Sequence, residues 1–220
     1  MFWAVCRWFT ICRTTEALEL ENTFMDFTVR RRLGIAIMVD GADVHGHARL
    51  CDNFGARWNA RHSGILAAWR QVFMEAGGHV PDRNVERMLR TTHIPTDVDD
   101  NRRLDIIVPG LSVARGRPLF CATAIVTPIS RTGRPRPGTS NRGGRLLEEA
   151  ERGNNNTYHE VDSSGLGALY SLGAEVYGRW SAQCVELVPA LARERARGLH
   201  PRVRRGTALG LQHRWWRTVS

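Results

Sequence analysis

Lysine is absent from this 220-residue chain, so all 31 of its basic residues are arginines. They outnumber 22 acidic residues and give a net charge of +9. Guanidinium groups match the geometry of phosphate oxygens, so an arginine-only excess favours a polyanionic partner. A codon bias toward arginine would raise the charge without any partner. The arginines gather at 30–32, 131–145 and 193–205, and this clustering favours phosphate contact.

Cysteine and long apolar runs are also scarce. The five cysteines are odd in number and widely spaced, which argues against a disulfide framework and for a reducing compartment. The apolar start, Met1 to Cys12, is interrupted by Arg7, is too short to span a bilayer and lacks a basic leader region. We therefore expect a nuclear or cytoplasmic protein that is not secreted, with no membrane partner.

The remaining pattern predicts alternating helices and strands. Helices are expected at 16–36, at 65–76 with Ser63 as its cap, at 145–152 with fraying at 153–156, at 180–197 and at 203–220. Strands are expected at 102–108, 119–127 and 168–176. Residues 82–90 fit a helix slightly better than a strand, 97–101 form an acidic turn, and 129–144 form a basic loop. This order predicts an α/β (α+β) fold with a small mixed sheet flanked by helices.

One acidic residue, Asp105, interrupts the apolar strand at 102–108. An unpaired buried charge costs several kcal/mol, so packing alone does not ask for a carboxylate there. Two interpretations stay open at this stage. Asp105 could pair with Arg102 or Arg103 at a strand end, or it could be a metal-binding carboxylate on a nuclease-type sheet.

An ordered set of short motifs adds to this pattern. They are Arg102–Asp105, Cys121–Pro128, Arg131–Pro135, Ala150–Arg152 with Tyr158, Glu175–Trp180 and Arg214–Trp216. In order and spacing they resemble the carboxy-terminal region of reverse-transcriptase polyproteins from non-LTR retrotransposons, of the type abundant in dinoflagellate and other algal genomes. The resemblance covers roughly residues 27–218 and implies a restriction-endonuclease-like core that nicks target DNA.

The resemblance also implies a set of catalytic groups, which this chain meets only in part. The family's chemistry uses two carboxylates on adjacent strands to hold Mg²⁺, and a lysine that orients or activates water. Asp105 matches the first carboxylate, Ala122 stands in place of the second, and Asn154 stands in place of the lysine. Glu175 matches a further acidic position. The expected catalytic residues are thus Asp105 and Glu175, with Mg²⁺ at Asp105 only if the protein is active.

Upstream, the segment Asp43–Cys51 resembles the second half of the family's zinc knuckle, without the preceding Cys-x-x-Cys pair. Candidate zinc ligands are His47 and Cys51, with His45 beside them. Structural zinc takes four ligands, and these residues supply at most three. We therefore expect no structural zinc.

Several residues are candidates for contact with nucleic acid. They are Arg131, Arg134 and Arg136 in the basic loop, and Arg214 and Trp215 near the end of the chain. Adjacent helical positions point about 100° apart, so at least one of Trp215 and Trp216 should pack inward. Trp69 and Trp180 lie on apolar helix faces and are expected in the core.

These observations divide the chain into an N-terminal helical extension (1–38), a degenerate zinc-knuckle-like segment (39–60), an endonuclease-like domain (61–200) and a basic, aromatic tail (201–220). The expected function is a retroelement-derived domain with a degraded active site that binds nucleic acid, DNA rather than RNA, and no small-molecule substrate. Two alternatives stay open: an active Mg²⁺-dependent endonuclease using Asp105 and Glu175, and a pseudogene product without a function.

Overall fold

The computed structural model of the protein describes residues 56–81, 87–130 and 132–219. Its elements, in chain order, are α4 (Ala56–Ala76), β1 (Arg87–Met88), η2 (Leu89–Thr91), β2 (Arg103–Leu104), β3 (Ile106–Val108), η3 (Ser112–Ala114), β4 (Leu119–Val126), α5 (Arg145–Thr157), α6 (His159–Ser163), β5 (Ala168–Glu175), α7 (Ala182–Ala196) and α8 (Pro201–Val219). The helices expected at 16–36 and the segment 39–55 lie outside the described residues. None of the described helices is both long and apolar enough to cross a bilayer.

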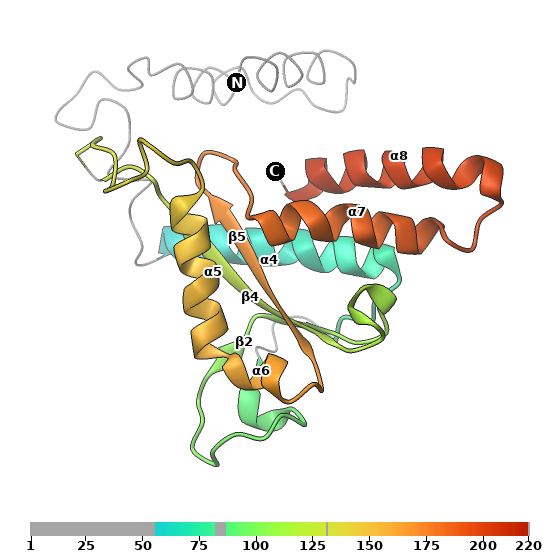
Figure 1. The fold of residues 1–220 in the computed structure, drawn as a ribbon, viewed down its shortest axis with the longest axis horizontal. Helices are drawn as coiled ribbons and strands as arrows, with labels where there is room; N and C mark the ends of the chain where they lie inside the picture. The colour runs from blue at the N-terminus through green and yellow to red at the C-terminus, as the bar shows by residue number, and fades with distance from the viewer. Residues whose placement is uncertain (1–55, 82–86, 131, 220) are drawn as a thin grey trace.

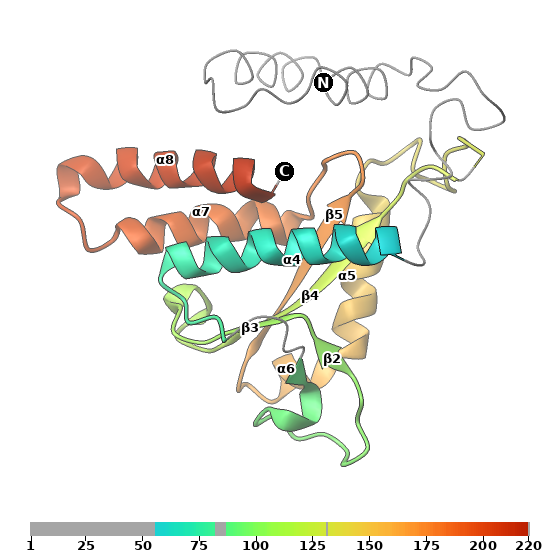
Figure 2. The ribbon, with the colours of Figure 1, turned by 180° about the vertical axis from the view of Figure 1, so that it is seen from behind.

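The sheet is small and mixed, as the sequence predicted. Its strand order is β3-β4-β5, with β3 antiparallel and β5 parallel to β4. The chain passes from β4 to β5 through α5 and α6, a crossover that parallel neighbours require. Figures 1 and 2, which view opposite sides, place α4 on one face of the sheet and α5 on the other. The predicted α/β class is confirmed.

Alternate residues of the strands enter two different cores, because side chains of a strand point to opposite faces. Leu119 and Cys121 join the main core, which also contains Trp69 of α4, Leu187 of α7 and Trp215 of α8. Phe120, between them, joins a second core with β2, α6 and η2. Strand β4 therefore contributes side chains to both cores and lies between them.

Two predicted helices are longer than expected. By Ala56 the chain is already in α4, and Ser63 is an exposed residue inside the helix and not its cap. In the additional N-terminal turns of α4, Trp58 stacks on His62, with ring centroids 6.2 Å apart, and this contact stabilises the helix there. Likewise α5 continues through the expected fraying point to Thr157, because Asn154 donates a hydrogen bond to Ser171 of β5. Tertiary contact here overrides weak helix propensity.

The helix predicted for 82–90 is wrong for residues 87–90, which are the described part of this segment. Arg87 and Met88 form β1 and pair with Leu104 and Arg103 of β2. Leu89 then enters the second core with no exposed surface. Pairing with β2 and burial of Leu89 therefore determine the conformation of this segment, because its own sequence has only a weak helical pattern.

The outer edge of β5 is largely paired, although no strand of the described residues lies beside it. The N–H of Leu169 donates to the Asp162 carboxylate, and the N–H of Ser171 donates to the Gln183 side chain. Further along, the N–H of Glu175 donates to the carbonyl of Arg179. Side chains and a turn thus supply the hydrogen bonds that a fourth strand would otherwise make.

Candidate catalytic site and basic surfaces

Asp105 occupies the bend between β2 and β3. Its backbone N–H donates to the carbonyl of Cys121 at 3.0 Å, and its Oδ2 accepts the N–H of Thr123 at 2.5 Å. The carboxylate therefore takes the place of a backbone carbonyl in the hydrogen bonding to β4, at the point where the backbone of Asp105 bends away from that strand. Arg102, offered by the sequence as a partner, binds Asp100 and Glu160 instead, both at 2.7 Å.

A histidine from α4 faces the other oxygen of this carboxylate. His62 Nε2 lies 3.5 Å from Asp105 Oδ1, and the two side chains are 22% and 18% exposed. The sequence analysis did not identify His62. Its spacing from Leu66 and Trp69, four and seven residues on, would have placed it on the buried face of the helix.

The positions that the family resemblance singles out lie at neighbouring points of the sheet. Ile106 pairs with Cys121, and the N–H of Asp105 also donates to the Cys121 carbonyl, so both residues lie opposite Cys121, as in a β-bulge. Ala122 in turn pairs with Ser171. Asn154 reaches the same pair from α5, since its Nδ2 donates to Ser171 Oγ at 2.7 Å. Ala122, Ser171 and Asn154 thus lie together, whereas Asp105 binds the next residue of β4, Thr123, and its carboxylate lies toward His62 of α4. We call Asp105, Ala122, Ser171 and Asn154 the catalytic row.

The donor atoms of the catalytic row do not fit Mg²⁺. Magnesium takes oxygen ligands, usually one or two carboxylates with water and phosphate. Here Asp105 already uses one oxygen for the N–H of Thr123, Ala122 offers a methyl group, and the Ser171 hydroxyl is engaged by Asn154. Among the described residues no group of three or more His, Cys, Asp and Glu side chains could hold a metal ion.

Glu175, the second predicted catalytic residue, lies away from this row. It ends β5, pairs with Val126, and lies 3.6 Å from Arg179 Nε. Since Asp105 binds at Thr123, three residues earlier on β4, the separation along the strand alone is about 10 Å. Burial raises the pKa of Glu175, while Arg179 and the N–H of Gly144 act against this. Glu175 thus anchors the loop before α5, and the structure does not bring it together with Asp105.

The predicted zinc ligands His47 and Cys51 lie outside the described residues, as does His45. The expectation of no structural zinc therefore stays a prediction. Purified protein should contain no stoichiometric zinc, and a chelator should leave its thermal unfolding unchanged, because a structural metal contributes directly to folding. Loss of melting temperature on chelation would show that the segment binds metal.

The basic loop at 129–144 is confirmed as irregular structure with well-defined internal contacts. Its backbone is closed by the bond from Arg136 N–H to the Pro128 carbonyl, and Arg142 pairs with Glu148 at 2.7 Å. Arg134 and Arg136 are exposed, as a phosphate contact requires. Arg131 lies outside the described residues.

Trp215 is the clearest correction among the predicted nucleic-acid contacts. It is fully buried in the main core, and its Nε1 donates to Glu75 Oε2 at 2.6 Å. A buried indole cannot stack on a base. Arg214, although exposed, lies 2.6 Å from the same oxygen, so these two residues attach α8 to α4. Trp69 is buried as predicted, and Trp180, which is partly buried against the same core, meets it edge-on with ring centroids 5.7 Å apart.

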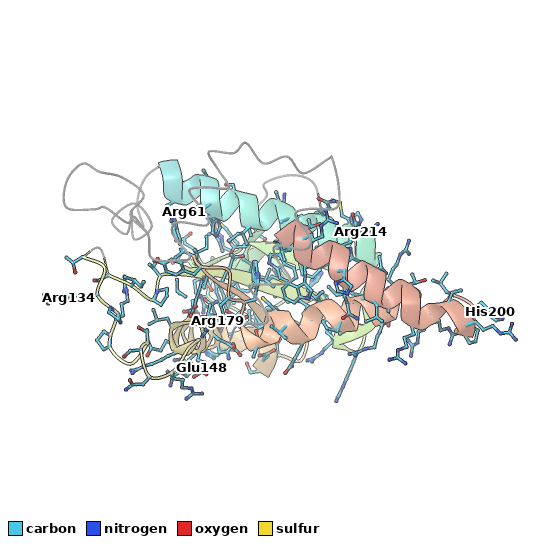
Figure 3. All side chains as sticks on the ribbon, turned by 90° about the horizontal axis from the view of Figure 1, so that it is seen from above. Arg61, Arg134, Glu148, Arg179, His200 and Arg214 are labelled. Atoms are coloured by element: carbon cyan, nitrogen blue, oxygen red, sulfur yellow. The ribbon has the colours of Figure 1, made fainter. Side chains whose placement is uncertain are left out.

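The two arginine clusters of the described chain lie far apart. Figure 3 shows Arg134, in the basic loop, at one end of the molecule and His200, between α7 and α8, at the other. Residues 193–205 contain six arginines and one glutamate, and 129–144 contain four arginines and no carboxylate. A polyanion that contacts both clusters must therefore extend along the molecule.

Comparison with protein-family models, with curated proteins and with solved structures gave no match for this chain.

Proposed function

We propose that this protein is a retroelement-derived, endonuclease-like domain that has lost its catalytic groups and binds nucleic acid. The observation that carries the proposal is the catalytic row. Ala122 and Asn154 both lie beside Ser171, and they stand where the family resemblance calls for a carboxylate and a lysine. The remaining carboxylate, Asp105, serves the backbone of β4.

This arrangement favours the binding module over an active Mg²⁺-dependent endonuclease. That alternative needs Asp105 and Glu175 at one metal, and Glu175 instead holds the start of α5 with Arg179. Arginine cannot take over the role of the missing lysine as a base, because its guanidinium stays protonated.

The proposed partner is DNA, held through its phosphates. Arg193, Arg195, Arg202 and Arg205 at the α7–α8 end form no ion pair with another described residue. Unpaired, exposed guanidinium groups keep their full charge for phosphate oxygens. We propose that one duplex extends between this end and the basic loop, because arginines outnumber carboxylates in both segments.

Salt dependence tests this proposal. Affinity for a duplex should fall steeply with ionic strength, with log K linear in log[salt], because bound arginines release counterions. The double variants Arg134→Gln with Arg136→Gln, and Arg202→Gln with Arg205→Gln, should each reduce the slope by about one unit per lost phosphate contact. The matched control is Arg152→Gln, an exposed arginine on α5 outside both clusters. A flat salt response, or no binding at low salt, would contradict the proposal.

A further inference from the structure

A groove runs between the outer edge of β5 and helix α7. It encloses about 720 Å³, within the size range of small-ligand sites. Leu169 and Tyr170 line it from β5, and Gln183, Glu186, Pro189 and Arg193 line it from α7. The groove borders the catalytic row, because Gln183 accepts the N–H of Ser171, and helix α7 lies away from the basic loop (Figure 1).

Tyr170 is the aromatic wall of this groove. One side of its ring packs against the main core, and the residue stays partly exposed. Its hydroxyl forms no hydrogen bond with another described residue. Burial raises the pKa of Tyr170.

Helix α7 forms the second wall of the groove, with the negative charge of Glu186 at one end of this wall and the positive charge of Arg193 at the other. Glu186 and Arg193 are seven residues apart, and therefore on one face about two turns from each other. Pro189 and Ala190 lie between them and present small apolar surface. Gln183 uses its Oε1 to accept the Ser171 N–H, so its Nε2 remains as a donor.

We propose that this groove binds an unpaired nucleotide of a single-stranded nucleic acid, with the base stacked on Tyr170. Arg193 then contacts a flanking phosphate. Glu186 accepts from an N–H group of the base, and the Nε2 of Gln183 donates to a base carbonyl. The inference rests on the proposed function and narrows it to unpaired strands at this site. In a duplex both faces of a base are covered by its neighbours, so the ring of Tyr170 would find no partner.

Charge and shape both support this occupant. Stacking on an aromatic ring beside arginines is how proteins hold single strands without reading their sequence. The groove joins such a ring to the arginine cluster at 193–205, which would track the backbone on either side. The same outer edge of β5 is closed to an added peptide strand, because Asp162 and Gln183 occupy the N–H groups of Leu169 and Ser171.

Fluorescence anisotropy with a short oligothymidylate and with a duplex tests the assignment. The variant Tyr170→Leu keeps an apolar side chain against the core but removes the ring. We expect affinity for the single strand to fall about tenfold, the scale of one lost stacking contact, and duplex affinity to stay within twofold. Tyr170→Phe should bind like the unaltered protein. Arg193→Gln should weaken single-strand binding, whereas Arg152→Gln, with the same change of charge elsewhere, should affect it less.

Photocrosslinking provides a measurement that needs no substitution. An oligothymidylate carrying one 5-iodouracil should crosslink to Tyr170 in the unaltered protein, and mass spectrometry locates the modified residue. Crosslinks elsewhere, or equal losses for single strand and duplex in Tyr170→Leu, would overturn the groove assignment while leaving the proposed function in place. Failure of the protein to bind either nucleic acid would overturn both.

Discussion

Supercoiled plasmid incubated with this protein and Mg²⁺ or Mn²⁺ is expected to remain supercoiled. The catalytic row supplies one carboxylate, Asp105, and one of its oxygens already accepts the N–H of Thr123. Without the second carboxylate and the lysine, the metal is not held and the attacking water is neither oriented nor activated. Gel separation of nicked and supercoiled plasmid measures this directly.

Restoring the two missing groups should restore part of the reaction. In the double variant Ala122→Asp with Asn154→Lys, the new carboxylate comes one residue before Thr123, which binds Asp105, and the new ammonium group comes from α5 beside Ser171. We expect metal-dependent nicking about 10²-fold above the metal-free background, because one well-placed charged group commonly contributes that much. Adding Asp105→Ala to this variant should abolish the activity.

Stability provides a second measurement on the same variants. Ala122 is 6% exposed, so Ala122→Asp alone buries a carboxylate and should lower the free energy of unfolding by about 1–3 kcal/mol. Mn²⁺ should recover that loss if the two carboxylates face a common metal. Nicking by the unaltered protein that disappears in Asp105→Ala would instead establish the active endonuclease.

The change Trp215→Ala should lower the free energy of unfolding by about 3–5 kcal/mol, a large fraction of the total for a domain of this size. The indole is fully buried between α8 and the rest of the main core, and its truncation leaves a cavity. It also removes the hydrogen bond to Glu75. Urea unfolding followed by far-UV circular dichroism measures the loss.

The neighbouring tryptophan provides the matched control. Trp216 is partly exposed and meets Trp180 at a tilt, with centroids 6.3 Å apart. Its change to alanine should cost less than half as much. Glu75→Ala should lie between, at about 1–3 kcal/mol, because it leaves the Trp215 N–H buried without an acceptor. A loss below about 1 kcal/mol for Trp215→Ala would mean that α8 is not part of the folded core.

Local patterns predicted the parts of the fold that local chemistry decides. The β-branched run at 119–127 is β4, and the apolar spacing of Cys184, Leu187 and Leu191 is the buried face of α7. A single carboxylate in an apolar run also drew attention to Asp105, whose catalytic role stays a prediction. Its partners could not be read from the chain, because Thr123 and His62 reach it only through the sheet register and the packing of α4.

The errors share one physical cause. Asn154 is a poor helix former, so the helix was expected to fray there. Its hydrogen bond to Ser171 instead keeps it inside α5. Trp215 beside two arginines resembles a stacking site, yet Glu75 and the main core enclose it. In both cases a contact distant in sequence decides the outcome. For the same reason the groove that joins Tyr170 to Glu186 and Arg193 could be found only in the folded chain.

The outer edge of β5 has a consequence for how copies of this protein behave toward one another. A short sheet with a bare edge is a template on which further strands can assemble into aggregates. Asp162 and Gln183 cover the N–H groups of Leu169 and Ser171, and at the opposite edge β3 is only three residues long. Removing these two covering side chains should therefore show first in solubility at high concentration, before any change in the binding of nucleic acid.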